Sequence, residues 1–332
     1  MSGGATSDRV RPPTVRDVLA AAARLAGVVR RTPLLDDPRT DRDLGGRLLL
    51  KPECLQYSGS FKFRGAYNAL AVLRPRAVVA WSSGNHAQGV ALAAARLGIP
   101  ATIVMPADAP AIKRRNTEAL GARLVLYDRA RESREEIGLA LARELGATVI
   151  RPYDEPLVIA GQGTVGVEIA RDLLARHMLA DRVVVPCGGG GLSAGIATAL
   201  ATLLPAAEVW IAEPAGFDDT RRSLAAGRRL RNPSGGRTLC DALMAPEPGE
   251  ITFPLNRRLL TGGVAVTDAE VEAAMRWAFD RFKLVVEPGG AVALAAILAG
   301  RIPLEGRTVV AVLSGGNVDA GLFARVLARD GG

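Results

Sequence analysis

Residues 78–89 read VVAWSSGNHAQG, an apolar run followed by a turn of small polar residues and the start of a helical pattern. The four apolar residues at 78–81 predict a buried strand, because such runs are typical of strands covered on both faces. The pattern of residues 86–97 predicts a helix, and the apolar run at 101–105 predicts a second strand. This order indicates a βαβ unit and a parallel sheet.

The same alternation continues along the chain in both directions. Other strands are expected at 48–50, 124–126, 148–150, 182–185, 208–212 and 308–313. Other helices are expected at 18–26, 109–120, 132–145, 163–174, 193–203, 268–282, 290–298 and 320–327, with Thr14 and Thr267 as caps. Residues 227–263 are broken by glycine and proline and are expected to wrap the surface. We expect an α/β protein of two domains, in which residues 76–150 form a small unit inserted into a larger domain of residues 1–75 and 151–332.

Composition excludes several classes of protein. The chain has 332 residues and 48% hydrophobic content, enough for a sizeable core. No stretch approaches the roughly 20 apolar residues of a membrane span, and residues 1–13 do not resemble a signal peptide, so we expect a cytoplasmic protein. Cys54, Cys187 and Cys240 lack metal-binding spacing. The net charge of +8 is scattered and aromatic residues make up 4% of the chain, so no nucleic-acid partner is expected.

Lys62 lies in the stretch SGSFKFRGA, residues 58–66, at the expected start of a helix. The chain has 42 basic residues, but only Lys51, Lys62, Lys113 and Lys283 are lysines. A desolvated lysine can lose its proton and attack an aldehyde, whereas arginine stays protonated. Lys62 is therefore a candidate for amine chemistry. The alternative is an ordinary surface lysine.

The loop PCGGGGL, residues 186–192, joins an expected strand to an expected helix. Its glycines let backbone N–H groups converge on an anion at a helix N-terminus, so we expect it to hold a phosphate. However, Gly189, Gly191 and Ala194 also fit the dinucleotide pattern G-x-G-x-x-A, and Glu213 ends the next strand. From the loop alone, a nicotinamide-dependent oxidoreductase is therefore an equally good interpretation.

Two further turns follow expected strands. The turn at 81–89 offers hydroxyl, amide and N–H groups suited to a carboxylate and a ring oxygen, although Ser82 or Ser83 could simply cap a helix and His86 could be a surface histidine. Ser314, in the turn SGGN at 314–317, could bond a heterocyclic nitrogen or belong to a simple turn. Ligands bind at this edge of open α/β sheets.

Together, SFKFRGA, SSGNHAQG, GGGGL and SGGN, in this order, resemble the fold type II pyridoxal-phosphate (PLP) enzymes, and within them the threonine/serine dehydratase and serine racemase group. The resemblance covers residues 31–319 and includes PYD at 152–154, AGQGT at 160–164, Asp241 and EPG at 287–289. It implies two open, mainly parallel sheets flanked by helices, as in tryptophan synthase β. It leaves the dinucleotide interpretation as a remote alternative.

The resemblance also implies roles for individual residues. Lys62 would bind the PLP aldehyde and remove the substrate's Cα proton, Phe61 would pack beside the ring, and Asn85 would bond its 3-hydroxyl group. Ser314 would face the ring nitrogen. The phosphate would be held by Gly188, Gly189, Gly190, Gly191 and Leu192, and the substrate carboxylate by Ser82, Ser83, Gly84, Asn85 and His86.

The implied reaction is β-elimination from L-threonine or L-serine, which yields a 2-oxo acid and ammonia. A 3-hydroxyaspartate dehydratase is an alternative. Serine racemase is another, because Ser83 would lie on the ring face opposite Lys62, where it could exchange the Cα proton. Ser83 could equally only bind the carboxylate.

The resemblance further implies a site for Mg²⁺, Mn²⁺ or Ca²⁺, with side-chain ligands Glu213 and Asp219 and the carbonyl of Phe217. The chain departs from the pattern at Phe217, where relatives usually have a small residue. It ends soon after Ser314, so the resemblance implies no C-terminal regulatory domain and no control by isoleucine. A homodimer and a small-molecule substrate are expected.

Overall fold

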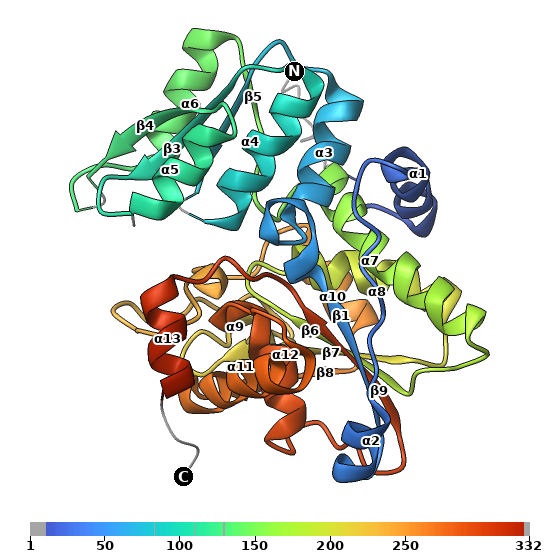
Figure 1. Ribbon diagram of the computed structural model, residues 1–332. Helices are drawn as coiled ribbons and strands as arrows, with labels where there is room; N and C mark the ends of the chain where they lie inside the picture. Colours follow the sequence, from blue (N-terminus) through green and yellow to red (C-terminus); the bar gives the residue numbers. More distant parts are fainter. Residues whose placement is uncertain (1–10, 83, 110, 129, 329–332) are drawn as a thin grey trace.

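The computed structural model describes residues 11–82, 84–109, 111–128 and 130–328, which form two parallel sheets flanked by helices (Figure 1). The larger sheet has the order β1 (Arg47–Pro52), β9 (Thr308–Leu313), β6 (Arg182–Pro186), β7 (Glu208–Pro214) and β8 (Gly262–Val266). The smaller sheet has the order β4 (Arg123–Tyr127), β3 (Ala101–Pro106), β2 (Val78–Trp81) and β5 (Thr148–Val149). The predicted fold class is therefore confirmed.

The helices of the first half are α1 (Val15–Leu25), α2 (Pro38–Leu44), α3 (Lys62–Leu73), α4 (Asn85–Leu97), α5 (Ala111–Ala119) and α6 (Arg134–Leu145). Those of the second half are α7 (Pro156–Ala175), α8 (Gly191–Leu203), α9 (Asp219–Ala226), α10 (Thr252–Leu259), α11 (Asp268–Phe282), α12 (Pro288–Leu298) and α13 (Ala320–Ala328). Short 3-10 turns occur at η1 (Glu53–Leu55), η2 (Tyr57–Gly59) and η3 (Asp241–Leu243). None of the helices described is both long and apolar enough to cross a bilayer.

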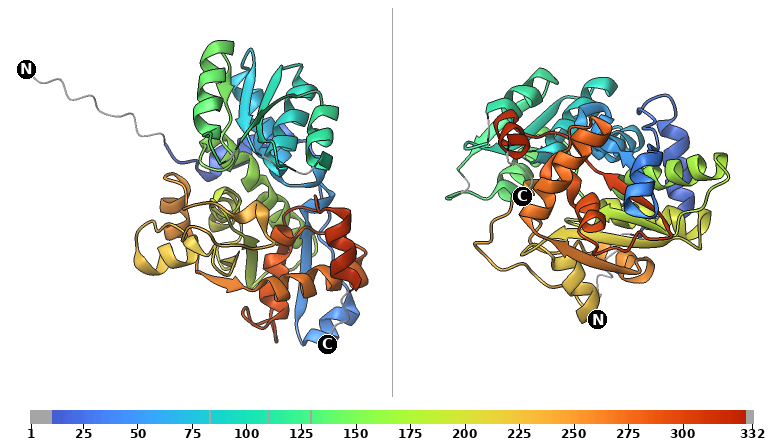
Figure 2. Two further views of the ribbon diagram at one scale, coloured as in Figure 1. Left: turned by 90° about the vertical axis from the view of Figure 1, so that its left-hand side faces the viewer. Right: turned by 60° about the horizontal axis from the view of Figure 1, so that its bottom comes forward.

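The strands inside each sheet are covered by helices on both faces, which explains the continuous apolar runs of β2, β3, β6 and β9. On the larger sheet, Leu48 and Leu50 pack with α11 and α12, whereas Leu49 packs with α7 and α8 on the opposite face. On the smaller sheet, Val78 packs with α3 and α4, and Val79 packs with α6. Figure 2 shows the two sheets in separate parts of the molecule, and α3 and α7 pack against each other. The domain division at residues 76 and 150 stays a prediction.

Several sequence expectations were wrong in detail. Helix α7 begins at Pro156, seven residues before the expected start, because Glu155 caps it by accepting the N–H of Leu157 at 3.1 Å. The short elements α2, α9, α10 and β8 were missed. Residues 227–263 do not merely wrap the surface, since Cys240 and Leu243 are buried and α10 packs against α8. The three missed helices have seven or eight residues, about two turns, which is too short for a clear helical pattern, and β8 begins with two glycines.

Candidate active site

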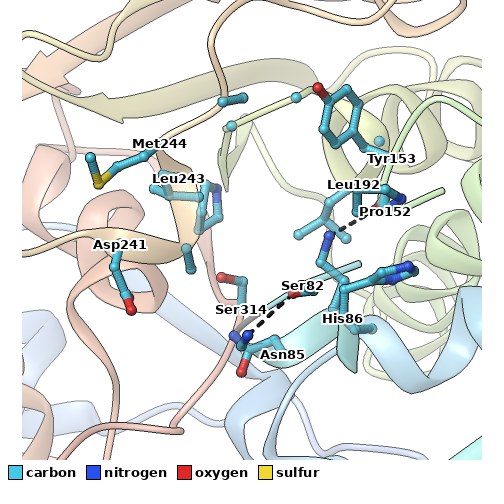
Figure 3. Close-up of a pocket in the computed structure, with 18 of the residues that line it drawn as sticks. Ser82, Asn85, His86, Pro152, Tyr153, Leu192, Asp241, Leu243, Met244 and Ser314 are labelled. Carbon is cyan, nitrogen blue, oxygen red and sulfur yellow. Dashed lines mark hydrogen bonds between the residues drawn. The ribbon is translucent and has the colours of Figure 1, made fainter. Parts of the chain in front are cut away.

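A cavity of about 190 Å³ is lined by residues that follow the carboxyl ends of β2 in the smaller sheet and of β6 and β9 in the larger sheet. Figure 3 shows side chains that line it. The structure brings together nearly all the predicted cofactor and substrate residues around it. These lining residues are Phe61, Lys62, Ser82, Gly84, Asn85, His86, Gly188, Gly189, Gly190, Gly191, Leu192 and Ser314. Ser83 lies outside the described residues. The three predicted turns therefore surround one site.

Lys62 is the first residue of α3, and its side chain lines the cavity. Its Nζ donates a hydrogen bond to the carbonyl oxygen of Pro152 at 2.8 Å and lies 5.1 Å from the centroid of the Phe61 ring. Burial lowers the pKa of Lys62 from 10.5 to about 8, although the carboxylate of Glu287 opposes the shift. The amine is therefore closer to its neutral, nucleophilic form than an exposed lysine.

The glycine loop 188–191 presents its backbone to the cavity. A Cβ atom on Gly189 would come within 2.3 Å of the Tyr153 ring, and one on Gly190 within 2.6 Å of Asn256 Nδ2. Gly190 also has a φ of +89°, which favours glycine. In the part of the chain described, the N–H groups of residues 188–190 donate to no other backbone group. The loop can therefore offer these N–H groups to an anion, next to the N-terminus of α8.

Asn85, the first residue of α4, is held by two side chains from the C-terminal half of the chain. Its Nδ2 donates to Glu287 Oε1, and its Oδ1 accepts from Asn317 Nδ2 at 2.7 Å. Burial, reinforced by Asp241, raises the pKa of Glu287 from 4.5 to about 7. The sequence motif included Glu287, but sequence reasoning assigned it no role, since its partner lies 202 residues away.

His86 is buried, not a surface histidine, with 3% of its surface exposed. Its Nε2 lies 2.9 Å from the carbonyl oxygen of Ile150, so Nε2 carries the proton and donates it. Burial and the charge of Lys62 lower the pKa of His86 from 6.5 to about 3, which keeps the ring neutral. Ser82 Oγ accepts the N–H of Gly84 at 3.2 Å and thereby shapes the turn before α4.

Charged side chains that sequence reasoning did not assign lie at the cavity wall. Lys113 Nζ of α5 and Asp241 Oδ2 of η3 form an ion pair of 2.6 Å. The pair connects the two lobes of the protein, one built around the smaller sheet and the other around the larger sheet. Arg134 is exposed at the start of α6, and its side chain has no hydrogen bond or ion pair with the residues described. Asp241 was among the residues that match the family, but sequence reasoning assigned it no role. Lys113 could have been noticed in the sequence because it is one of only four lysines in the chain.

The predicted metal ligands Glu213, Phe217 and Asp219 lie outside the cavity, at the end of β7 and the start of α9. The Glu213 carboxylate accepts the N–H groups of Thr220 and Arg221 at 3.1 and 2.7 Å. Asp219 Oδ2 has no hydrogen-bond partner among the described residues. Burial, and then repulsion by the Asp219 carboxylate, raise the pKa of Glu213. Burial raises the pKa of Asp219 to about 6.

Glu213 and Asp219 are two buried carboxylates that repel each other, which suits a divalent ion with the Phe217 carbonyl as a further donor. The positive charge of Arg222 also acts on Asp219 and offsets part of this repulsion. Within the ranges that the structure describes, however, no group of three or more acidic, histidine or cysteine side chains is placed to hold a metal. The candidate site would therefore rely on backbone oxygen and water for its remaining ligands.

The cavity supplies an amine of lowered pKa, a set of N–H groups for an anion and the Ser314 hydroxyl. These groups match the aldehyde, the phosphate and the ring nitrogen of PLP. The residues present therefore fit this cofactor.

Comparisons with known proteins agree with that fit. L-threo-3-hydroxyaspartate ammonia-lyase of Pseudomonas sp is 42% identical over 94% of this chain and 97% of its own length. The solved T.th. threonine deaminase is 46% identical, with a TM-score of 0.87 over 92% of this chain and 99% of its own. Maize serine racemase is 36% identical, with a TM-score of 0.88 over 95% and 97%. Residues 25–315 match the model of the family described as "Pyridoxal-phosphate dependent enzyme", and the chain belongs to that family.

Proposed function

We propose that the protein is a PLP-dependent ammonia-lyase that converts a β-hydroxy amino acid, such as L-threonine or L-serine, to a 2-oxo acid and ammonia. The observation that carries the proposal is the position of Lys62, whose amine of lowered pKa faces the cavity between the glycine loop and Asn85. The names of the threonine and hydroxyaspartate relatives support the same reaction class.

When bound, PLP supplies an electron-withdrawing ring that accepts the charge left as the substrate's Cα proton departs. Lys62 Nζ takes that proton, and a well-placed base contributes typically about 10² to 10⁴ in rate. The N–H groups of Gly188–Leu192 would hold the phosphate, and the Ser314 hydroxyl would bond the ring nitrogen without forcing its protonation. Glu287 and Asn317 fix the Asn85 amide, so one of its N–H bonds remains for the 3-hydroxyl oxygen.

The substrate carboxylate binds at the turn formed by Ser82 to His86. This turn precedes α4, where free N–H groups and the helix dipole favour negative charge. His86 is neutral and donates its Nε2–H to the Ile150 carbonyl, so it contributes no positive charge there, and the carboxylate depends on the N–H groups of the turn.

A second candidate substrate is L-threo-3-hydroxyaspartate, favoured by Arg134, whose side chain has no partner among the described residues at the cavity wall. The extra carboxylate of this substrate would pair with the guanidinium, and Lys113 lies on the same lobe. Threonine and serine have no group that uses a cation in this position. The test compares 2-oxo acid release from all three amino acids.

The variant Arg134→Met should lower kcat/KM for 3-hydroxyaspartate by about ten- to hundredfold, the effect of losing one hydrogen bond to a charged group. L-threonine should change less than about twofold. Arg131→Met is the matched control, because Arg131 is 85% exposed and does not line the cavity. An equal loss of kcat/KM for 3-hydroxyaspartate and L-threonine in Arg134→Met would contradict 3-hydroxyaspartate as the substrate.

The same assay distinguishes elimination from racemisation. Appearance of the D-enantiomer without 2-oxo acid, abolished by Ser83→Ala, would reassign the protein as a racemase. The variant Lys62→Ala should lose the absorption band of the lysine-bound cofactor. A wild-type protein without that band after incubation with PLP would contradict the proposed role of Lys62.

A further inference from the structure

Helix α10 lies directly behind the glycine loop, on the side away from the cavity. Thr252 Oγ1 donates a hydrogen bond of 2.7 Å to the carbonyl oxygen of Gly189, and Asn256 Nδ2 lies 3.4 Å from that of Gly190. Both side chains are fully buried. The Gly189 peptide is therefore tied to α10 by its carbonyl oxygen. The Gly190 carbonyl is held more closely by α8, through the N–H of Ala194 at 2.9 Å and the hydroxyl of Ser193 at 3.0 Å.

Helix α10 is in turn held by Asp154. Its carboxylate accepts the N–H groups of Glu250 and Ile251 at 2.9 Å and that of Thr252 at 3.2 Å. These are backbone donors at the start of the helix that lack an intrahelical partner. Asp154 therefore fixes where α10 begins, and so fixes the position of the Thr252 hydroxyl relative to the glycine loop.

The direction of these carbonyl groups decides where the N–H groups of the loop point. A trans peptide is planar, and its C=O and N–H bonds point in opposite directions. With the Gly189 carbonyl directed at Thr252, the N–H of Gly190 is directed at the cavity, and the Gly190 carbonyl likewise orients the N–H of Gly191. Glycine peptides rotate readily without such restraint.

We propose that Thr252 and Asp154 are positioning residues for the cofactor phosphate, which hold the glycine loop in its anion-binding orientation without touching the phosphate. The inference rests on the proposed phosphate site at residues 188–192. It predicts that loss of either side chain weakens binding of the phosphate group and leaves binding of the pyridine ring and aldehyde unchanged.

The test uses the full-length protein, freed of cofactor with an aminothiol and titrated with PLP or with pyridoxal, which lacks the phosphate. Thr252→Val removes the hydroxyl at nearly constant volume and should weaken PLP binding about three- to tenfold, the range for one hydrogen bond. Pyridoxal binding should change less than about twofold. Thr252→Ser should restore the wild-type ratio, and Asp154→Ala should act in the same direction as Thr252→Val.

Thr198→Val is the matched control. Its hydroxyl is also buried and donates to a backbone carbonyl, that of Ala194 at 2.7 Å, which lies in α8 and not among residues 188–190 of the loop. This variant should leave both dissociation constants unchanged. Circular dichroism of each cofactor-free variant confirms that the binding measurements refer to folded protein.

Unchanged PLP binding in Thr252→Val, or equal weakening of PLP and pyridoxal, would overturn the positioning role alone. A wild-type protein that binds pyridoxal as tightly as PLP would instead overturn the phosphate site itself. The two failures are therefore separated by the wild-type titrations.

Discussion

Asn85 at the start of α4 donates a side-chain hydrogen bond to Glu287 at the start of α12, and so connects the two lobes beneath the cavity. Burial raises the pKa of Glu287 from 4.5 to about 7. Between these values the folded protein binds more protons than the unfolded chain, so the free energy of unfolding falls as pH rises through this window.

Glu287→Gln should abolish that fall in the cofactor-free protein, a difference of about 2 to 3 kcal/mol between the ends of the window. Urea unfolding across the window, measured on wild type and variant, provides the comparison. Glu118→Gln, at an exposed position of α5, is the control. Parallel stability curves for wild type and Glu287→Gln would show that Glu287 titrates normally.

Lys62→Met should have opposite effects on activity and on stability. Removal of the base should lower 2-oxo acid formation by at least about 10²-fold. Because the folded pKa of about 8 lies below 10.5, the unfolded chain binds more protons between these values, and burial of the ammonium costs stability below them. The cofactor-free variant should therefore unfold at higher temperature than wild type near neutral pH, whereas Lys283→Met should not.

Asp241→Asn should change substrate preference more than stability. The Lys113 and Asp241 side chains are 16% and 56% exposed, so their ion pair should contribute less than about 1 kcal/mol. Loss of the Asp241 charge leaves Lys113 free for an acidic substrate. The ratio of kcat/KM for 3-hydroxyaspartate to that for L-threonine should rise severalfold, and an unchanged ratio would exclude Lys113 from substrate recognition.

Glu213→Gln should abolish a stabilising effect of divalent cations. If Glu213 and Asp219 bind a cation, millimolar MgCl₂ or CaCl₂ should raise the unfolding temperature of the wild-type protein by a few degrees, through preferential binding to the folded state. Asp218→Asn is a demanding control, because Asp218 pairs with Arg221 and Arg222 instead. Equal shifts in Glu213→Gln and wild type would place the cation elsewhere.

Arg64→Met should be strongly destabilising. Arg64 is fully buried and pairs with both Glu53 and Glu168 at 2.7 Å, and Lys51 also pairs with Glu168. Removal of one cation leaves buried carboxylates unbalanced, which costs about 3 to 5 kcal/mol. Urea unfolding should show this loss, and Arg39→Met, which removes a side chain that is 74% exposed, should cost less than about 0.5 kcal/mol. A small effect at Arg64 would mean that water enters the cluster.

The sequence predicted the fully buried elements well because their burial leaves a continuous apolar pattern. The runs at 78–81 and 308–313 are apolar almost throughout, since the strands they form are covered on both faces. Helix α10 has no such pattern, because it is short and its start depends on Asp154, nearly a hundred residues earlier. Local periodicity cannot reveal a cap supplied by another part of the chain.

The candidate site shows the same limit. Lys62 and the glycine loop were found from local motifs, because their chemistry requires specific residue types in a short stretch. The contacts of Glu287 with Asn85 and of Lys113 with Asp241 join residues 202 and 128 positions apart. Only the fold brings these pairs together, so no local pattern could indicate them.

Three consecutive residues, Pro152, Tyr153 and Asp154, each contact a different part of the site. The Pro152 carbonyl accepts a hydrogen bond from the Lys62 amine, Tyr153 covers Gly189, and Asp154 caps α10. An insertion or deletion of one residue in this segment would displace the Pro152 carbonyl and the Tyr153 and Asp154 side chains at once. The spacing between residues 150 and 155 is therefore fixed in length, and length variants here should be far less tolerated than in the exposed turn at 233–237.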